Sequence, residues 1–139
     1  MKKLAVVAAL LLGTAVAVAQ APRTPAAQGT ELYIISPADN ATVTGPVTVR
    51  FGLKGMGVAP AGIQLPDTGH HHLLVDTDVP PLDKPIHADA KHVHFGKGQT
   101  ETTLTLAPGK HTLQLILGDH LHIPHQPAVV SPKITITVK

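Results

Sequence analysis

Seven short runs of strand-forming residues predict an all-β protein: 32–35, 47–53, 70–75, 92–95, 102–106, 111–117 and 134–138. In 47–53, 102–106 and 111–117 the apolar residues recur at every second position, which is typical of half-buried strands. Turn-forming clusters such as Ser36–Asn40 and Ala107–Gly109 separate the runs, and no stretch has the 3.6-residue apolar period of a helix. We therefore expect an immunoglobulin-like antiparallel β-sandwich of about seven to eight strands.

The N-terminal residues have the pattern of a secretory signal peptide. Lys2 and Lys3 precede an apolar run over residues 4–12, and small residues at positions 17–19 stand just before Gln20. The apolar run is short for a membrane span. We predict cleavage before Gln20, a periplasmic or secreted location, and no membrane span after cleavage.

The remaining chain is expected to hold one domain. After the signal peptide (1–19), residues 20–29 are rich in Pro, Ala and Gly and predict a flexible lead-in. Residues 30–139 then form the His-rich β-sandwich domain. Removing Lys2 and Lys3 from the 11 basic residues leaves nine, against nine acidic ones, so the domain has no basic surface for nucleic acid. The absence of Cys excludes disulfides, thiolate metal sites and a Cys nucleophile.

Ten histidines carry the candidate chemistry, and all of them lie between positions 70 and 125. Each of three groups contains a His-x-His pair. On a strand, residues i and i+2 point to the same face about 6.5–7 Å apart, so both imidazoles can bind one ion at about 2 Å. We predict a metal site built from these groups: His70, His72, His92, His94, His120, His122 and His125.

Other residues near these groups have structural interpretations. His71 shares a strand face with Leu73, and one member of the 70–72 triplet can be a hydrogen-bonded core residue. His111 is expected in the core or at its rim, and His87 in a solvated Pro-rich loop. Asp119 is a metal ligand, an acceptor for an imidazole N–H, or the cap of a turn.

The donor types favour Cu(II) or Zn(II). Imidazole suits these ions and serves hard, oxygen-seeking ions poorly. Only Met56 would remain after signal-peptide cleavage, and there is no Cys, so a soft Cu(I) site of sulfur ligands is not expected.

Several stretches resemble one bacterial exported family, called domain of unknown function 4399. They are GHHHLLVD (69–76), HVHFGKGQTET (92–102), GKHTLQLILGDH (109–120), HIPHQP (122–127) and SPKITITV (131–138). The resemblance implies that His70–His72, His92, His94, His111, His122 and His125 belong to a shared motif. It implies no activity.

Three functions remain open from the sequence. The first is a protein that buffers, sequesters or delivers Cu(II) or Zn(II). The second is a His-metal enzyme, redox or hydrolytic, which needs an open metal position and a nearby base. The third is a metal-free interaction module whose partner is an unknown envelope protein.

Overall fold

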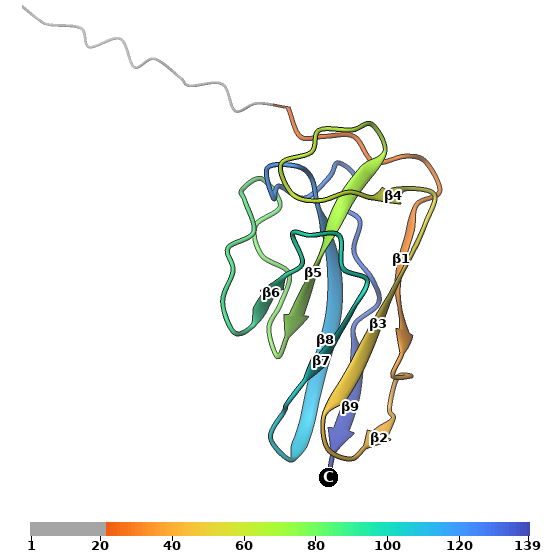
Figure 1. Ribbon diagram of the computed structural model, residues 1–139, viewed down its shortest axis with the longest axis vertical. Helices are drawn as coiled ribbons and strands as arrows, with labels where there is room; N and C mark the ends of the chain where they lie inside the picture. Colours follow the sequence, from red (N-terminus) through yellow and green to blue (C-terminus); the bar gives the residue numbers. More distant parts are fainter. Residues whose placement is uncertain (1–21) are drawn as a thin grey trace, which may run out of the picture.

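The computed structural model describes residues 22–139, so the predicted signal peptide (1–19) and the first residues of the lead-in lie outside it. Within the described residues the chain forms nine strands (Figure 1). Their bounds are β1 Glu31–Ser36, β2 Thr42–Val43, β3 Val47–Lys54, β4 Gly57–Val58, β5 Thr68–Val75, β6 His92–His94, β7 Glu101–Leu104, β8 Gly109–Gly118 and β9 Ile134–Val138. Every run predicted from the sequence overlaps one of them.

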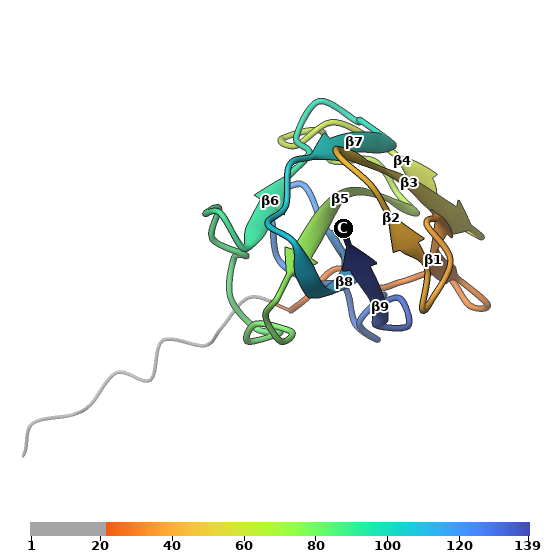
Figure 2. The same ribbon diagram turned by 90° about the horizontal axis from the view of Figure 1, so that it is seen from below.

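The strands form two layers, which confirms the predicted β-sandwich. One sheet has the order β1-β3-β7, and the other has the order β2-β9-β8-β5-β4 with β6 also paired to β5. Seen end-on, β3 and β7 lie across from β5, β8 and β9 (Figure 2). The pairings are antiparallel except for two short parallel ones, β2–β9 and β4–β5.

The space between the layers is filled by the alternating apolar residues. β3 contributes Val49 and Phe51, and β8 contributes Leu113, Leu115 and Leu117, all of them buried. Because side chains alternate between faces along a strand, the same alternation that predicted the strands also defines the core.

The larger sheet is also buried on its outer face. Leu74 of β5 and Ile116 of β8 pack there with Ile86, which comes from the loop between β5 and β6. As a result, β5 is buried at nearly every position rather than at every second one. This double burial explains why residues 70–75 carry no clean polar–apolar alternation, and it puts His70 and His72 under a covering layer.

The lead-in is attached to the domain over part of its length, contrary to the flexible segment expected from its composition. The Ala26 N–H donates to the Gln126 carbonyl, and the Gln126 N–H donates to the Thr24 carbonyl. Arg23 also donates to the carbonyl oxygens of Pro124 and His125. Composition alone could not predict these bonds, because the partner lies about a hundred residues away.

The two shortest strands were not predicted. β2 and β4 each contain two residues and pair in parallel with distant strands, so neither is long enough to show a period. Over residues 22–139 the structure contains no helix of the length and apolarity that a membrane crossing requires.

Candidate metal centre

Four histidines from three separate segments meet on the outer face of the larger sheet. β5 supplies His70 and His72, β6 supplies His94, and the segment after β8 supplies His122. One ring nitrogen from each lies within 4.8 Å of those of the other three. We call these four residues the four-His cluster.

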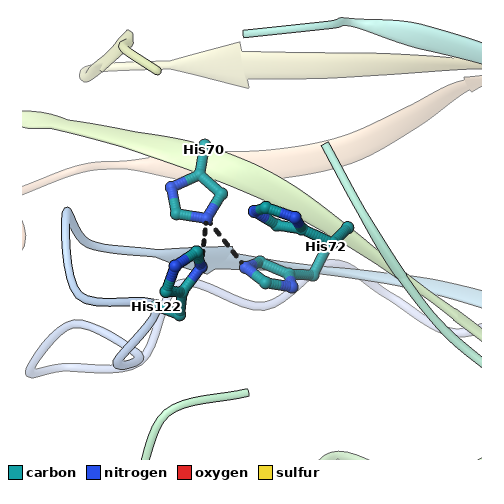
Figure 3. Close-up of side chains that lie close together, drawn as sticks. His70, His72 and His122 are labelled. Carbon is teal, nitrogen blue, oxygen red and sulfur yellow. Dashed lines mark hydrogen bonds between the residues drawn. The ribbon is translucent and has the colours of Figure 1, made fainter. Parts of the chain in front are cut away.

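The strand register brings one pair of these histidines together directly. His72 lies opposite His94 across the β5–β6 pair, whereas His70 lies opposite Gly118 across the β5–β8 pair. Since i and i+2 on a strand share a face, His70 and His72 lie on the same side of β5, and the His70 ring is in contact with the ring of His122 (Figure 3).

The ring nitrogens face a common centre. His70 Nε2 lies 3.0 Å from His72 Nε2 and 3.1 Å from His122 Nδ1, and Figure 3 shows both contacts meeting at the His70 ring. One ring nitrogen has either one proton or one lone pair, so it cannot make two good hydrogen bonds to neighbours of this kind. A metal ion would use the lone pairs of all of them at once.

A tight turn holds His122 in place. The buried Asp119 carboxylate accepts the main-chain N–H groups of Leu121 and Ile123, each at 2.9 Å, and the Thr24 hydroxyl at 2.6 Å. His122 adopts a left-handed backbone conformation with φ of 65°, which is uncommon for residues other than glycine. Asp119 is therefore a turn cap, and it does not belong to the four-His cluster.

Charge is retained on this capping carboxylate. Burial alone would raise the pKa of Asp119, but the hydrogen bonds from Thr24 and from the N–H groups of Ile123 and Leu121 lower it below its ordinary value. The turn that presents His122 therefore keeps an ionised acceptor at neutral pH.

Two glycines leave room for the rings. A Cβ at Gly118 would lie 2.9 Å from His72 Nε2, and a Cβ at Gly96 would lie 2.3 Å from His94 Cε1. Side chains larger than hydrogen at these positions would push the rings out of place. Glycine at both positions is thus part of how the sequence forms the cluster.

We expect Gly118→Ala to weaken metal binding more than about tenfold and to cost roughly 1–3 kcal/mol of stability through overpacking. The His72 ring is fully buried, so it has little space to move away. Calorimetric titration with Zn(II) measures the affinity. Gly57→Ala is the matched control, since its Cβ would make only ordinary contact, 3.5 Å from Thr68 Cγ2. Equal affinities for the two variants would contradict this account of the glycine.

Burial favours the uncharged form of three of the four histidines in the cluster. The pKa of His70 falls to about 4 and that of His72 to about 2, first through loss of hydration and then through repulsion from neighbouring histidines. The pKa of His94 is also lowered, for the same reason and by repulsion from His122. His70, His72 and His94 are therefore neutral at pH 7, with lone pairs that a metal can take without competing with protons.

Several buried nitrogens have no hydrogen-bond partner within the described residues. In the cluster they are Nδ1 of His70, Nδ1 of His72 and Nε2 of His94. An unsatisfied buried polar atom typically costs about 1–3 kcal/mol, so these nitrogens destabilise the metal-free fold. Unpaired buried groups of this kind call for a functional explanation.

Three of the seven predicted ligands lie outside the four-His cluster. His92 is beside Asp89, His120 is half-buried away from the other rings, and the buried His125 donates Nε2–H to the Thr68 carbonyl at 3.1 Å. His120 and His92 each belong to a His-x-His pair of which only the other member reaches the centre. Strand spacing places His92 and His94 on one face of β6 but does not say which of them faces the partner segment, and His120 and His122 lie in a turn, where strand spacing does not apply.

A second group of donors was missed. His87, Asp89 and His92 also bring one possible ligand atom each within 4.8 Å of one another. The sequence predicted a solvated position for His87, which is indeed exposed, but did not predict its contact with Asp89. The three-residue spacing between Asp89 and His92 could have indicated their contact, because an Asp three residues before a strand commonly accepts main-chain N–H groups there.

The remaining two histidines, His71 and His111, have structural positions away from both groups. His71 is fully buried in the core against Phe51, with ring centroids 5.1 Å apart. His111 lies at the rim, 2.7 Å from the Asp76 carboxylate, and the hydrogen bonds to Asp76 and to the Ala107 carbonyl raise its pKa. The expectation of one core histidine in the triplet holds for the position of His71, but its ring has no hydrogen-bond partner.

Comparison with known proteins finds a matching family but no function for it. A family model described as domain of unknown function DUF4399 matches residues 49–139, a range that includes all ten histidines. No curated protein matches the sequence. Among solved structures, the fibronectin(III)-like modules of Clostridium thermocellum CbhA are similar with 14% identity and a TM-score of 0.35, covering 77% of this chain and 92% of that one.

Proposed function

The chain belongs to the DUF4399 family, a domain of unknown function, and from its own residues we propose that it is an exported protein that binds a metal ion through the four-His cluster. The observation that carries this proposal is the convergence of four ring nitrogens within 4.8 Å. Buffering or sequestration of Zn(II) or Cu(II) is the role this site supports best. Export is inferred from the signal-peptide pattern of residues 1–19.

The spacing of the rings fits a tetrahedral ion. Five of the six centroid distances within the cluster lie between 4.8 and 5.0 Å, and only the pair His72–His122 is longer, at 6.0 Å. A square arrangement needs two long diagonals. In a tetrahedral Zn(II) site with bonds of about 2.0–2.1 Å, neighbouring nitrogens lie about 3.3–3.4 Å apart, close to the 3.0 and 3.1 Å found between His70 and its two neighbours.

Zn(II) is therefore the favoured ion, although Cu(II) binds most nitrogen sites more tightly. Cu(II) prefers tetragonal geometry, which this cluster does not provide. Replacement by Co(II) tests the geometry, because tetrahedral Co(II) gives intense visible bands and octahedral Co(II) gives weak ones. A weak spectrum from a stoichiometric Co(II) complex would contradict the tetrahedral assignment.

The same geometry argues against an enzyme. Catalytic zinc sites keep a position open for water or substrate, whereas structural or storage sites are filled by four protein ligands. Four imidazoles fill a tetrahedral shell. Tight binding without turnover is what we infer for this centre.

The test is calorimetric titration of untagged protein with Zn(II) at neutral pH. We expect His122→Ala to lower the affinity more than about 100-fold, since loss of an outer partner alone typically costs roughly 10–100-fold. His120→Ala is the control, two residues away and outside the cluster. If wild-type protein binds neither Zn(II) nor Cu(II), the proposal fails and a metal-free interaction module becomes the better interpretation.

A further inference from the structure

A second group of metal-ligating side chains lies in the segment that leads into β6. The Asp89 carboxylate accepts Nε2–H of His87 at 2.9 Å through Oδ2 and Nδ1–H of His92 at 2.8 Å through Oδ1. The two rings lie with their centroids 4.1 Å apart. Three donors of types that bind zinc are thus collected within six residues of chain.

The backbone holds the carboxylate between the two rings. Asp89 Oδ1 also accepts the main-chain N–H groups of Lys91 and His92, both at 2.8 Å. These bonds fix a turn that ends where β6 begins. The group is therefore pre-organised, which reduces the entropy cost of collecting ligands around an ion.

This group differs from the four-His cluster in exposure and charge. The side chains of His87 and Asp89 are 62% and 48% exposed, whereas that of His92 is 10% exposed. The hydrogen bonds from His92 and Lys91 lower the pKa of Asp89, so the group has an anionic ligand that the cluster lacks. An ion from solvent reaches these side chains without any opening of the fold.

From this geometry we propose that His87, Asp89 and His92 form a second, solvent-exchangeable site for a divalent transition-metal ion. This second site shares no residue with the four-His cluster. The two sites are neighbours, because His92 and His94 lie on one face of β6 about 6.5–7 Å apart. An ionised carboxylate only accepts hydrogen bonds, so both rings now hold protons toward Asp89. The group offers three ligand atoms rather than four, and two of its side chains are solvent-exposed, so we expect the second site to be the weaker one.

Reciprocal variants test this proposal by Zn(II) titration of the full untagged chain. We expect two ions per wild-type chain, one tight and one weaker. His87→Ala should remove only the weaker ion, His122→Ala only the tight one, and His120→Ala neither. His87 is exposed, so its loss is not expected to disturb folding. Zn(II)-dependent shifts of the His87 ring resonances in wild-type protein provide a second readout that needs no variant.

The possible failures are distinguishable. A single ion that is lost in His122→Ala and kept in His87→Ala, with no shift of the His87 resonances, overturns the second site and leaves the proposed function intact. A single ion lost only in His87→Ala overturns the role of the four-His cluster and supports the exposed site. In the second case the Asp89 turn would be the functional centre of the domain.

Discussion

Zn(II) is expected to raise the melting temperature of the protein by about 12–24 °C. An ion at a thousand times its dissociation constant stabilises the folded state by about 4 kcal/mol if it binds only that state. For a domain of this size, each kcal/mol shifts the melting temperature by roughly 3–6 °C. The ion would also use a lone pair of the His94 ring, whose Nε2 is buried and has no partner in the described residues.

Differential scanning calorimetry with and without Zn(II), followed by chelation, measures this shift. In His122→Ala the Zn(II)-dependent increase should be largely lost, while His120→Ala should behave as wild type. A melting temperature that does not change with Zn(II) in the wild-type protein would contradict a metal ion as the stabilising partner of the cluster.

Much of the fold could be predicted because its strands are amphipathic. β3 and β9 face the core with one side and less buried surroundings with the other, and β8 does so except at Ile116, so their period of two is visible in residues 47–53, 111–117 and 134–138. β5 was recognisable only by its apolar content, because both its faces are covered. The two-residue strands β2 and β4 depend on partners that no local pattern identifies.

The candidate site was predictable in kind but only partly in membership. Spacing correctly put His70 and His72 on one face of a strand, and it did the same for His92 and His94. What it could not provide is the register between β5 and β6, which sets His94 opposite His72 and leaves His92 opposite Leu74. Likewise, His122 and not His120 reaches the cluster because a turn capped by Asp119 orients that residue. Such choices depend on contacts between distant segments.

The three histidines of β5 differ in the face of the sheet on which they lie. His70 and His72 point out of the sandwich toward the four-His cluster, whereas His71 points into the core beside Phe51 and Leu73. Both ring nitrogens of His71 are buried without a hydrogen-bond partner. The buried nitrogens of His71 therefore destabilise the fold, and the four-His cluster does not use them.

We expect His71→Leu to stabilise the metal-free protein by about 1–3 kcal/mol at neutral pH, the usual cost of leaving a buried polar group unsatisfied. Leu is apolar and of similar size, and the strand hydrogen bond from the Phe95 N–H to the carbonyl of residue 71 is kept. Urea denaturation measures the change. The Zn(II)-dependent shift should persist, because the side chain of residue 71 lies on the face opposite His70 and His72. A variant less stable than wild type would show that the imidazole makes a favourable contact in the core.

The same substitution should reduce the sensitivity of the protein to acid. Burial lowers the pKa of His71 from 6.5 to about 4, so between these two pH values the unfolded chain binds a proton at this residue that the folded chain does not. The free energy of unfolding then falls as pH falls, by about 1.4 kcal/mol per pH unit for each such histidine. Above pH 6.5 this loss is absent, and His70 and His72 add to it on the acid side. His71→Leu should remove one histidine's share of the slope between pH 6 and 4.5, and an unchanged slope would mean that the ring of His71 is accessible to protons in the folded state.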